Sequence, residues 1–279
     1  MNPSQPSESA LEGLHVLVTG STDGIGRHTA ESLVRAGSIV HVHGRSADKI
    51  ERTVAALEKE KKGARVPRGF LADLASLEET AGLARKIVEE VPRLDVIIHN
   101  AGIGTAGKAR ETSRDGYELR FAVNYLAPFL LTRNLIAAGR APRALINVSS
   151  IGQEELDFDD LMSERHYSGI SAYCRSKLAQ ILFTFDVAET HPELKTHALH
   201  PGTYLDTNMV RRAGVQPLGS PAEGADATVF VLRHALSDGP SGLYFDQQRP
   251  SRAHPQAYDR AARERLRKAS ENLTAEFLT

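Results

Sequence analysis

The sequence predicts a single α/β domain in which a mainly parallel, seven-stranded sheet is doubly wound by helices. From residue 14 onward, short apolar runs alternate with longer amphipathic stretches, and no linker or repeat divides the 279 residues. Such alternation requires crossover connections, which build a parallel sheet covered on both faces. The apolar runs are also continuous, as in Val16-Leu17-Val18, which is typical of strands buried on both faces.

Composition narrows the class of protein. The chain is 41% hydrophobic and 25% charged, as in ordinary globular proteins, with a net charge of −1 and a pI near 6.8. This balance gives neither the basic surface of a nucleic-acid binder nor a polybasic membrane patch. No apolar run is long enough to span a bilayer, no signal segment opens the chain, and Cys174 has no disulfide partner. We therefore expect a cytoplasmic protein with a small-molecule substrate, no nucleic-acid partner and no membrane span.

The chain divides into a polar segment and one domain. Residues 1–12 are rich in Ser and Pro and predict a flexible N-terminal tail, followed by a single domain over 13–279. β-Branched and apolar runs predict seven strands at 14–19, 39–43, 65–72, 94–99, 144–149, 196–200 and 243–245. Helical periodicity predicts helices near 25–36, 47–61, 76–91, 113–138, 171–190 and 221–236, and a further helix-like stretch over 257–271.

A glycine-rich turn follows the first strand and opens the first helix. It reads Thr19-Gly-Ser-Thr-Asp-Gly-Ile-Gly26, with spacing G-x-x-x-G-x-G in place of the usual dinucleotide pattern G-x-G-x-x-G. Glycines here permit a tight turn and a close approach to a diphosphate at the positive end of a helix. No G-K-[ST] ending follows, which disfavours a nucleoside triphosphatase loop. An ordinary strand-to-helix connection also uses glycine, so the turn alone leaves both interpretations open.

The T-G-x-x-x-G-I-G pattern resembles the short-chain dehydrogenase/reductase family, and the similarity extends from about Leu14 to Phe245. The resemblance implies the dinucleotide-binding Rossmann fold. It also implies that the turn holds the cofactor through Gly20, Ser21, Asp23, Gly24, Ile25 and Gly26.

The end of the second strand indicates which dinucleotide is bound. NAD-preferring proteins usually place an acid there for the ribose 2′-hydroxyl, whereas this sequence has Gly44 followed by Arg45. An arginine pairs well with a 2′-phosphate, which favours NADP(H). The alternative is a solvated loop arginine without a partner.

Three further segments match the family's cofactor site. Asp73 and Leu74 follow the third strand at the family's adenine-binding position, and Asn100-Ala101-Gly102 matches the end of its N-N-A-G segment, with His99 replacing the first Asn. That replacement concerns a stabilising contact of the central sheet. Pro201-Gly202-Thr203 resembles the segment beside the nicotinamide; because the spacing is one residue longer than usual, Thr207 is an equal candidate for the hydroxyl contact.

A Tyr-x-x-x-Lys pair forms the candidate catalytic centre. Tyr173 and Lys177 are four residues apart, so a helix would present both on one face. A free tyrosine has a pKa of about 10, and a neighbouring cation would lower it toward neutrality. An isolated match is more often an exposed helical pair. The resemblance adds Ser150, which would polarise a substrate carbonyl, and Asn124, which would hold a relay water; a buried asparagine closing a helix kink is the other interpretation of Asn124.

These residues predict an NADP(H)-dependent oxidoreductase that interconverts an alcohol and a carbonyl, with Tyr173 as acid/base and no metal. The long interval between Ser150 and Tyr173 resembles the retinol-dehydrogenase-like branch, which implies an apolar aldehyde or ketone. We expect substrate loops at 151–171 and 203–221. A catalytically silent NADP(H) sensor of the same fold is the alternative, and a sugar-nucleotide epimerase is disfavoured by the glycine spacing. The resemblance further implies a homodimer or homotetramer through the helices at 113–138 and 171–190.

Overall fold

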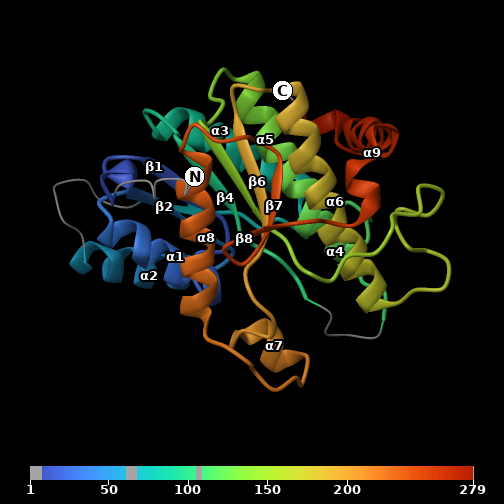
Figure 1. Ribbon diagram of the computed structural model, residues 1–279, viewed down its shortest axis with the longest axis horizontal. Coiled ribbons are helices and arrows are strands. Elements are labelled where there is room, and N and C mark those ends of the chain that lie inside the picture. The colour runs from blue at the N-terminus through green and yellow to red at the C-terminus, as the bar shows by residue number, and fades with distance from the viewer. Residues whose placement is uncertain (1–7, 61–67, 105–108, 279) are drawn as a thin grey trace.

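The central layer of the molecule is one eight-stranded sheet with helices packed on both faces (Figure 1). The computed structural model describes residues 8–60, 68–104 and 109–278. The strand order is β3-β2-β1-β4-β5-β6-β7-β8, and β1 to β7 run parallel. The strands are β1 (His15–Val18), β2 (Ile39–Gly44), β3 (Arg68–Leu71), β4 (Val96–His99), β5 (Ala144–Val148), β6 (Lys195–His200), β7 (Leu243–Asp246) and β8 (Arg249–Ser251).

The predicted fold class is confirmed, with one strand more than predicted. β8 is three residues long, fully exposed, and antiparallel to β7 at the sheet edge. Its sequence, Arg-Pro-Ser, has no apolar alternation, and Pro250 is tolerated only because the strand lies on an edge. The predicted third strand covered 65–72; its residues 65–67 lie outside the described residues.

One face of the sheet is covered by α1 (Gly24–Arg35), α2 (Ala47–Glu60) and α8 (Pro221–Ala235). Leu33 of α1, Val231 of α8 and Val40 of β2 are fully buried in the core between these helices and the sheet. The predicted helix over 47–61 ends at Glu60 in the described chain, and Lys61 lies outside it. Capping explains where α8 begins, because Ser220 and Glu223 form a reciprocal capping box.

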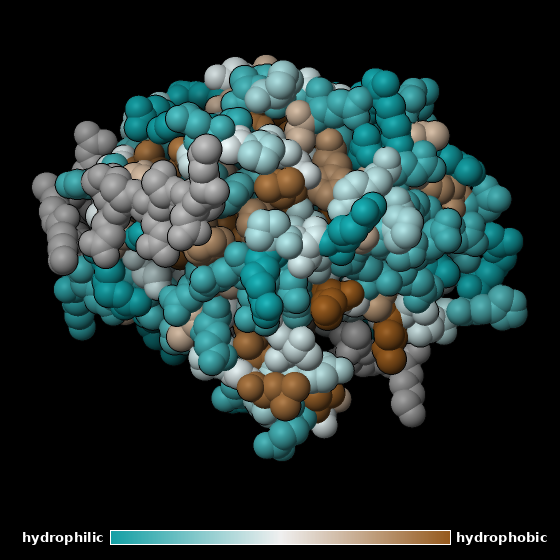
Figure 2. Space-filling model, in the orientation of Figure 1, coloured by the Kyte–Doolittle hydropathy of each residue, from teal (hydrophilic) through white to brown (hydrophobic). Residues whose placement is uncertain are grey.

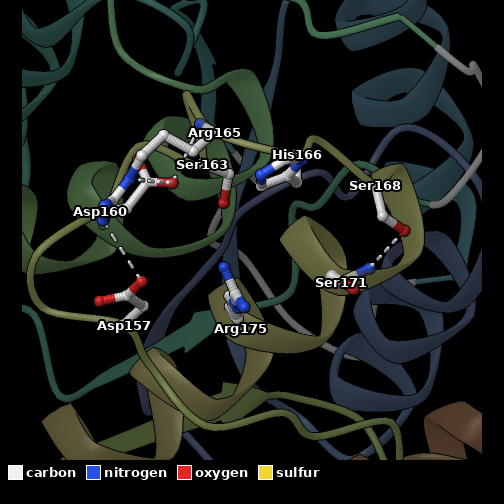
Figure 3. A pocket seen from close by; sticks show the side chains of 8 residues that line it. All are labelled: Asp157, Asp160, Ser163, Arg165, His166, Ser168, Ser171 and Arg175. Atoms are coloured by element: carbon white, nitrogen blue, oxygen red, sulfur yellow. Dashed lines mark hydrogen bonds and ion pairs between the residues drawn. The ribbon is translucent and has the colours of Figure 1, made fainter.

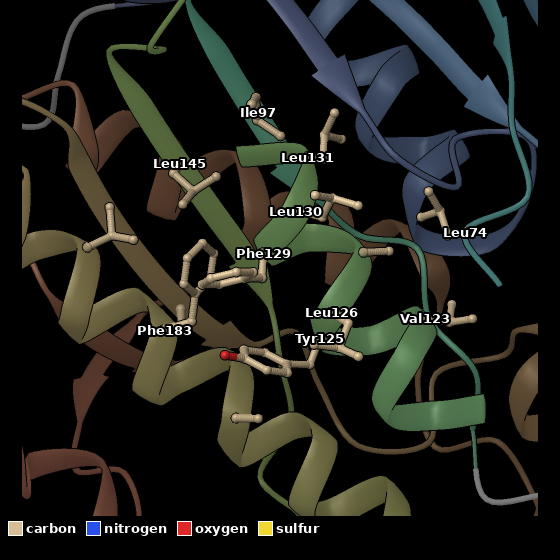
Figure 4. Packing of buried hydrophobic residues seen from close by; sticks show 14 of the residues in the cluster. Leu74, Ile97, Val123, Tyr125, Leu126, Phe129, Leu130, Leu131, Leu145 and Phe183 are labelled. Carbon is tan, nitrogen blue, oxygen red and sulfur yellow. The ribbon is translucent and has the colours of Figure 1, made fainter. Parts of the chain in front are cut away.

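The opposite face carries α3 (Leu77–Glu90), α5 (Ala127–Ala137), α6 (Gly169–Thr190) and α9 (Arg260–Leu273). Figure 4 shows the aromatic residues that fill this side, with Tyr125 and Phe129 directed toward Phe183. The Phe129 and Phe183 ring centroids are 5.6 Å apart, and those of Tyr125 and Phe183 are 6.3 Å apart. Edge-to-face packing of this kind fixes α5 against α6, the helix that carries the candidate catalytic pair.

The helix predicted over 113–138 is shorter and interrupted. It consists of α4 (Leu119–Phe121), a π-helical turn (Ala122–Leu126) and α5. Pro128 cannot donate the hydrogen bond that a regular helix would need, and the register shifts: the Ala127 N–H donates to the carbonyl of Ala122, five residues back. The buried Asn124 sits inside this turn, so the kink interpretation of Asn124 is confirmed.

Short helical turns occur in segments where the sequence analysis predicted a tail or a loop. Residues 1–7 of the predicted tail lie outside the described residues, but Glu8–Leu11 forms a 3-10 turn, Leu11 is fully buried, and its carbonyl accepts a 2.7 Å hydrogen bond from Ser38 Oγ. Within the predicted loop 203–221, α7 (Asn208–Arg212) is a short helix. Short 3-10 turns at Pro255–Tyr258 and Ala275–Phe277 flank α9.

The C-terminal helix α9 packs against α6 and reaches α5 (Figure 1). Ser270 Oγ lies 2.7 Å from Tyr125 Oη, and Arg133 of α5 forms a 3.3 Å ion pair with Glu271. The oligomer predicted through α5 and α6 would therefore have to accommodate α9, which already covers part of both helices. None of the helices in the described segments is long and apolar enough to cross a membrane.

Four buried histidines make the free energy of unfolding sensitive to acid. Burial lowers the pKa of His41, His99 and His197 to about 3, and that of His43 to about 4, from an ordinary value of 6.5. The unfolded chain takes up protons below pH 6.5 while the folded chain keeps these rings neutral. Their contribution is therefore complete above pH 6.5 and is lost as the pH falls toward 4, at about 1.4 kcal/mol per pH unit for each ring.

We expect urea unfolding at pH 7.5, 6.0 and 5.0 to show a steep fall in stability over this range. His99→Asn places the family's asparagine at that position. It should reduce the slope of the free energy of unfolding against pH by the contribution of one histidine. His166→Asn is the matched control, because His166 is exposed and its φ of +52° suits asparagine. A pH-independent free energy of unfolding, or an equal effect of both variants, would contradict this.

Candidate active site

The glycine turn lies at the carboxyl edge of the sheet, between β1 and α1. Gly20 and Gly24 have φ values of +66° and +51°, which disfavour any side chain. A Cβ at Gly26 would lie 2.3 Å from Asn100 Nδ2 and 2.5 Å from the Gly20 carbonyl oxygen. The turn is therefore pressed against its neighbours and presents main chain to the edge of the sheet, where the N-terminus of α1 favours negative charge. This geometry fits a dinucleotide diphosphate.

Side chains of the turn are engaged within the protein. Ser21 is fully buried, and its Oγ accepts a 3.0 Å hydrogen bond from the N–H of His43. Asp23 Oδ1 accepts a hydrogen bond from the Gly24 N–H, and its Oδ2 accepts one of 2.6 Å from Asn208 of α7. Ile25 packs toward α8. Ser21 would therefore contact a ligand through its main chain, whereas the Asp23 side chain joins the turn to α7.

The end of β2 explains why no acid occupies the position expected for NAD preference. A Cβ at Gly44 would approach Thr22 Cγ2 to 2.8 Å, so a larger residue there would require the Thr22 side chain to move. Arg45, the next residue, is exposed and makes no ion pair with the residues that the structure describes. Its guanidinium is therefore available to a phosphate at this edge.

The residues predicted around the adenine lie at the end of β3. Asp73 Oδ1 accepts a 3.1 Å hydrogen bond from the Ala75 N–H, and Arg114 lies 3.8 Å from its other oxygen. Leu74 is 5% exposed and belongs to the core. Leu74 would thus contact a cofactor through its main chain, while its side chain anchors the loop.

The segment after β4 braces the glycine turn. Asn100 Nδ2 donates to the carbonyls of Thr19 and Gly20 at 2.9 and 3.3 Å, and the N–H of Ala101 donates to Thr19 Oγ1 at 3.1 Å. His99, which replaces the family's first asparagine, lies with Nε2 2.9 Å from Thr132 Oγ1. The replacement therefore retains a polar link, here between β4 and α5.

After β6, the structure separates the two threonines that the sequence left equal. Thr203 is exposed, and its Oγ1 lies 3.1 Å from His200 Nε2, beyond the Pro201-Gly202 turn. Thr207 caps α7, and its Cγ2 would lie 3.2 Å from a Cβ at Gly24. Thr207, and not Thr203, is thus the hydroxyl residue that lies against the glycine turn.

The four predicted catalytic residues meet beside this turn. Ser150 follows β5, and its side chain lies beside the Tyr173 ring, because a Cβ at Gly152 would lie 3.5 Å from Ser150 Oγ and 4.0 Å from Tyr173 Cε1. Lys177 lies one turn further along α6, with Nζ 5.9 Å from the centroid of the Tyr173 ring. A Cβ at Gly102 would lie 3.2 Å from Asn124 Oδ1 and 3.5 Å from Lys177 Nζ, so the glycine allows these groups to approach. Residues from β4, β5, α6 and the π-helical turn thereby converge.

The electrostatics differ from the sequence expectation that Lys177 lowers the pKa of Tyr173. Burial raises the pKa of Tyr173, and the hydrogen bond from Ser150 acts in the opposite direction. Burial also lowers the pKa of Lys177 to about 7. Its ammonium donates to the Val148 carbonyl at 2.8 Å and to Gln180 Oε1 at 3.0 Å. The low-polarity site therefore favours the neutral form of both groups, and Lys177 is directed to Val148 and Gln180.

Sequence reasoning missed two residues that support the centre. Gln180 accepts the hydrogen bond from Lys177, and its position three residues along the same helix is the signal that would have revealed it. Tyr244 of β7 donates a 3.0 Å hydrogen bond to the Ser150 carbonyl. No local pattern in the sequence indicated this contact, because the two residues are 94 positions apart.

Asn124 is held from two sides. Its Oδ1 accepts a 2.7 Å hydrogen bond from the N–H of Ile103, and its Nδ2 donates to the Ile103 carbonyl and to Ser176 Oγ, at 3.1 and 2.9 Å. These bonds lock the π-helical turn to the segment after β4 and to α6. Asn124 is thus at least a structural tie between the elements that form the site.

The two predicted substrate loops border the centre and expose apolar side chains. Ile151, Tyr204 and Leu218 are 58%, 50% and 72% exposed. Figure 2 shows apolar surface over α7 and along the adjoining edge of the molecule. Exposed apolar groups at a candidate site indicate a surface that an apolar ligand would cover.

A hollow of about 360 Å³ lies between the loop 151–171 and the first turns of α6 (Figure 3). Arg175 and His166 point into it, and Arg175 is ion-paired with Glu154 at 3.0 Å. Arg175 is two residues beyond Tyr173 and thus lies on another side of the helix. This hollow is therefore separate from the catalytic constellation.

Comparison with known proteins gives matches over most of the chain, from a family model, from two relatives and from a solved structure. The family model described as short chain dehydrogenase matches residues 14–217. Human retinol dehydrogenase 13 is 35% identical over 284 aligned positions, covering 94% of this chain and 84% of that protein. A Streptomyces sp. (strain C5) protein, named provisionally as daunorubicin C-13 ketoreductase, is 34% identical over 86% of this chain and 85% of its own. A protein from Escherichia coli CFT073 is classed provisionally as a short chain dehydrogenase and was crystallised with NADPH. Its structure superposes with a TM-score of 0.67 at 28% identity, and the match covers 87% of this chain and all of that one.

Proposed function

The chain belongs to the short-chain dehydrogenase/reductase family, and we propose that it is an NADP(H)-dependent enzyme that interconverts an alcohol and an apolar aldehyde or ketone, with Tyr173 as acid/base. The observation that carries this proposal is the convergence of Ser150, Tyr173, Lys177 and Asn124 beside the glycine turn. The names of the relatives, a retinol dehydrogenase and a ketoreductase, support the same class of reaction.

The residues at the carboxyl edge fit NADP(H). The main chain of the glycine turn would hold the diphosphate, and Arg45 would hold the 2′-phosphate. The segments at Asn100–Gly102 and Pro201–Thr203 would contact the rest of the cofactor. The complex of the Escherichia coli relative with NADPH supports the choice of NADP(H). When bound, the nicotinamide supplies or accepts the hydride. The crowded glycines support a backbone contact, because any side chain at Gly26 would occupy space that Asn100 and Gly20 already fill.

The chain's own residues would manage the carbonyl oxygen and its proton. The side chains of Ser150 and Tyr173 are neighbours and would together bind that oxygen. Because burial keeps Tyr173 protonated, its hydroxyl is ready to donate a proton in the reductive direction. Lys177, with a pKa near 7, can gain or lose a proton at neutral pH and would stabilise the tyrosinate formed beside it. Asn124 would hold the relay water that links this centre to solvent.

The test is titration of the purified protein with NADPH and NADH, followed by turnover of a panel of apolar aldehydes and ketones. The proposal expects tighter binding of NADPH and oxidation of NADPH by at least one carbonyl. Tight NADPH binding without turnover across the panel would favour the silent sensor, which shares the fold but needs none of Ser150, Tyr173 and Lys177. Absence of binding by either nucleotide would contradict both readings.

Arg45→Ala should selectively weaken NADPH binding. Loss of a charge-assisted contact to a phosphate is expected to raise the Kd for NADPH about tenfold to a hundredfold and to leave that for NADH nearly unchanged. Arg52→Ala is the matched control, because Arg52 is an exposed arginine of α2 whose Nε donates to the Asp48 carbonyl of its own helix. Isothermal titration calorimetry measures both constants. Equal weakening of NADPH and NADH by Arg45→Ala would remove the 2′-phosphate role.

A further inference from the structure

A cavity of about 310 Å³ opens next to the candidate catalytic serine, between the segment after β5 and the β7–β8 edge. We call it the outer pocket. Its polar lining consists of Gln153, Tyr244, Asp246, Ser251, Arg252 and His254. Tyr244 and Gln153 also support the catalytic centre, whereas Asp246, Ser251, Arg252 and His254 have no role in it.

The outer pocket is tied directly to Ser150. Both Tyr244 Oη and Gln153 Nε2 donate 3.0 Å hydrogen bonds to the Ser150 carbonyl. Ile151, which directly follows Ser150 in the chain, lines the outer pocket, so the pocket borders the segment that carries the candidate catalytic serine. The Ile151 side chain is 58% exposed and adds an apolar group to the lining.

The far wall is the C-terminal segment that follows β8, and it is fixed in place. The His254 N–H donates to Gln153 Oε1 at 2.7 Å, and Gln256 exchanges hydrogen bonds of 2.8 and 3.1 Å with the main chain of Leu156. Three hydrogen bonds thus join this wall to the substrate loop. A pocket whose walls are already joined loses little freedom when a ligand binds.

The charges of the pocket balance. Asp246 and Arg252 carry opposite charges, and neither forms an ion pair with any residue in the described ranges. Arg252 is held over the ring of Tyr258, with its guanidinium carbon 5.4 Å from the ring centroid, which leaves its N–H groups available. An anionic ligand would be attracted by Arg252 and repelled by Asp246. A cationic ligand would be attracted by Asp246 and repelled by Arg252. A neutral group that both donates and accepts hydrogen bonds satisfies both.

We propose that the outer pocket binds a neutral, polyhydroxylated end of the substrate. Asp246 accepts hydrogen bonds from its hydroxyl groups, and Arg252 donates hydrogen bonds to them. This inference rests on the proposed function, because it assigns the substrate of that site: a carbonyl compound with an apolar body and a hydroxylated tail. Asp246 and Arg252 then determine specificity and take no part in the reaction itself.

A matched pair of aldehydes tests the assignment. 4-Propoxybenzaldehyde and 4-(2,3-dihydroxypropoxy)benzaldehyde differ only in two hydroxyl groups. Their binding is measured by calorimetry with and without NADP⁺, which permits no reduction, and their kcat/KM is measured with NADPH. The wild type is expected to prefer the diol about tenfold in both measurements, and Arg252→Met and Asp246→Ala to lose that preference. Arg85→Met is the matched control, because Arg85 is an exposed arginine of α3 outside the pocket lining, and this variant should keep the preference.

The outcomes separate this proposal from the proposed function. If the wild type binds the diol more tightly and both Arg252→Met and Asp246→Ala abolish this preference, the outer pocket is supported even when neither aldehyde is reduced. The lack of reduction would then count against the proposed reaction and not against the pocket. Equal binding of the two aldehydes by the wild type, or a preference that survives both substitutions, overturns the outer pocket, and turnover of the aldehydes would then leave the proposed function standing.

Discussion

Tyr173→Phe is expected to lower kcat about 10²- to 10⁴-fold, the usual contribution of a general acid, while the Kd for NADPH stays close to that of the wild type. The substitution removes one hydroxyl, the partner of Ser150, and keeps the ring that packs on α6. Proton donation to the carbonyl oxygen would then fall to water. Single-turnover oxidation of NADPH with an active aldehyde measures the chemical step separately from binding.

Tyr117→Phe provides the comparison for Tyr173→Phe. It also removes a tyrosine hydroxyl, one that donates to the Leu273 carbonyl at 2.9 Å near the C-terminal helix. It should lower the free energy of unfolding by about 1 kcal/mol and leave kcat unchanged. A Tyr173→Phe enzyme that retains more than a tenth of the wild-type kcat would remove Tyr173 from the role of acid/base.

Gly26→Ala is expected to destabilise the protein by about 1–3 kcal/mol, as overpacking does, and to abolish measurable NADPH binding at micromolar protein. The added methyl would lie within 2.5 Å of the Gly20 carbonyl oxygen, which is main chain, and 2.3 Å from Asn100 Nδ2. Because the main chain of Gly20 cannot rotate away, the turn itself must open. Thermal unfolding and calorimetric NADPH titration measure the two effects.

Gly82→Ala is the matched control for Gly26→Ala. Gly82 also lies within a helix, α3, but a Cβ there would meet only Arg85 Nη2, at 3.7 Å. Alanine is favoured over glycine in a helix by up to about 1 kcal/mol, so this variant should be as stable as the wild type or more stable, with unchanged NADPH binding. Normal NADPH binding by Gly26→Ala would show that the turn tolerates a side chain and would remove the crowding argument.

The local sequence determined the elements whose signals are short-range. Strands such as β1 and β4 were predictable because continuous apolar runs mark strands buried on both faces. The glycine turn was predictable because its residues are contiguous. The shared face of Tyr173 and Lys177 followed from helical spacing alone. The exposed β8 was missed because Arg-Pro-Ser carries no apolar alternation. The helix predicted from residue 113 begins only at Leu119, because Gly116 adopts a φ of +83° in the turn before it.

Only the tertiary structure decided the surroundings of these residues. It placed Thr207 against Gly24, joined Tyr244 to Ser150, and turned the Lys177 ammonium toward Val148 and Gln180. It also reversed the expected direction of the Tyr173 pKa, since the degree of burial depends on every element packed around the ring. The physical reason is common to all of these: residue type and spacing determine which groups can react, whereas desolvation and long-range hydrogen bonds arise only when distant segments meet.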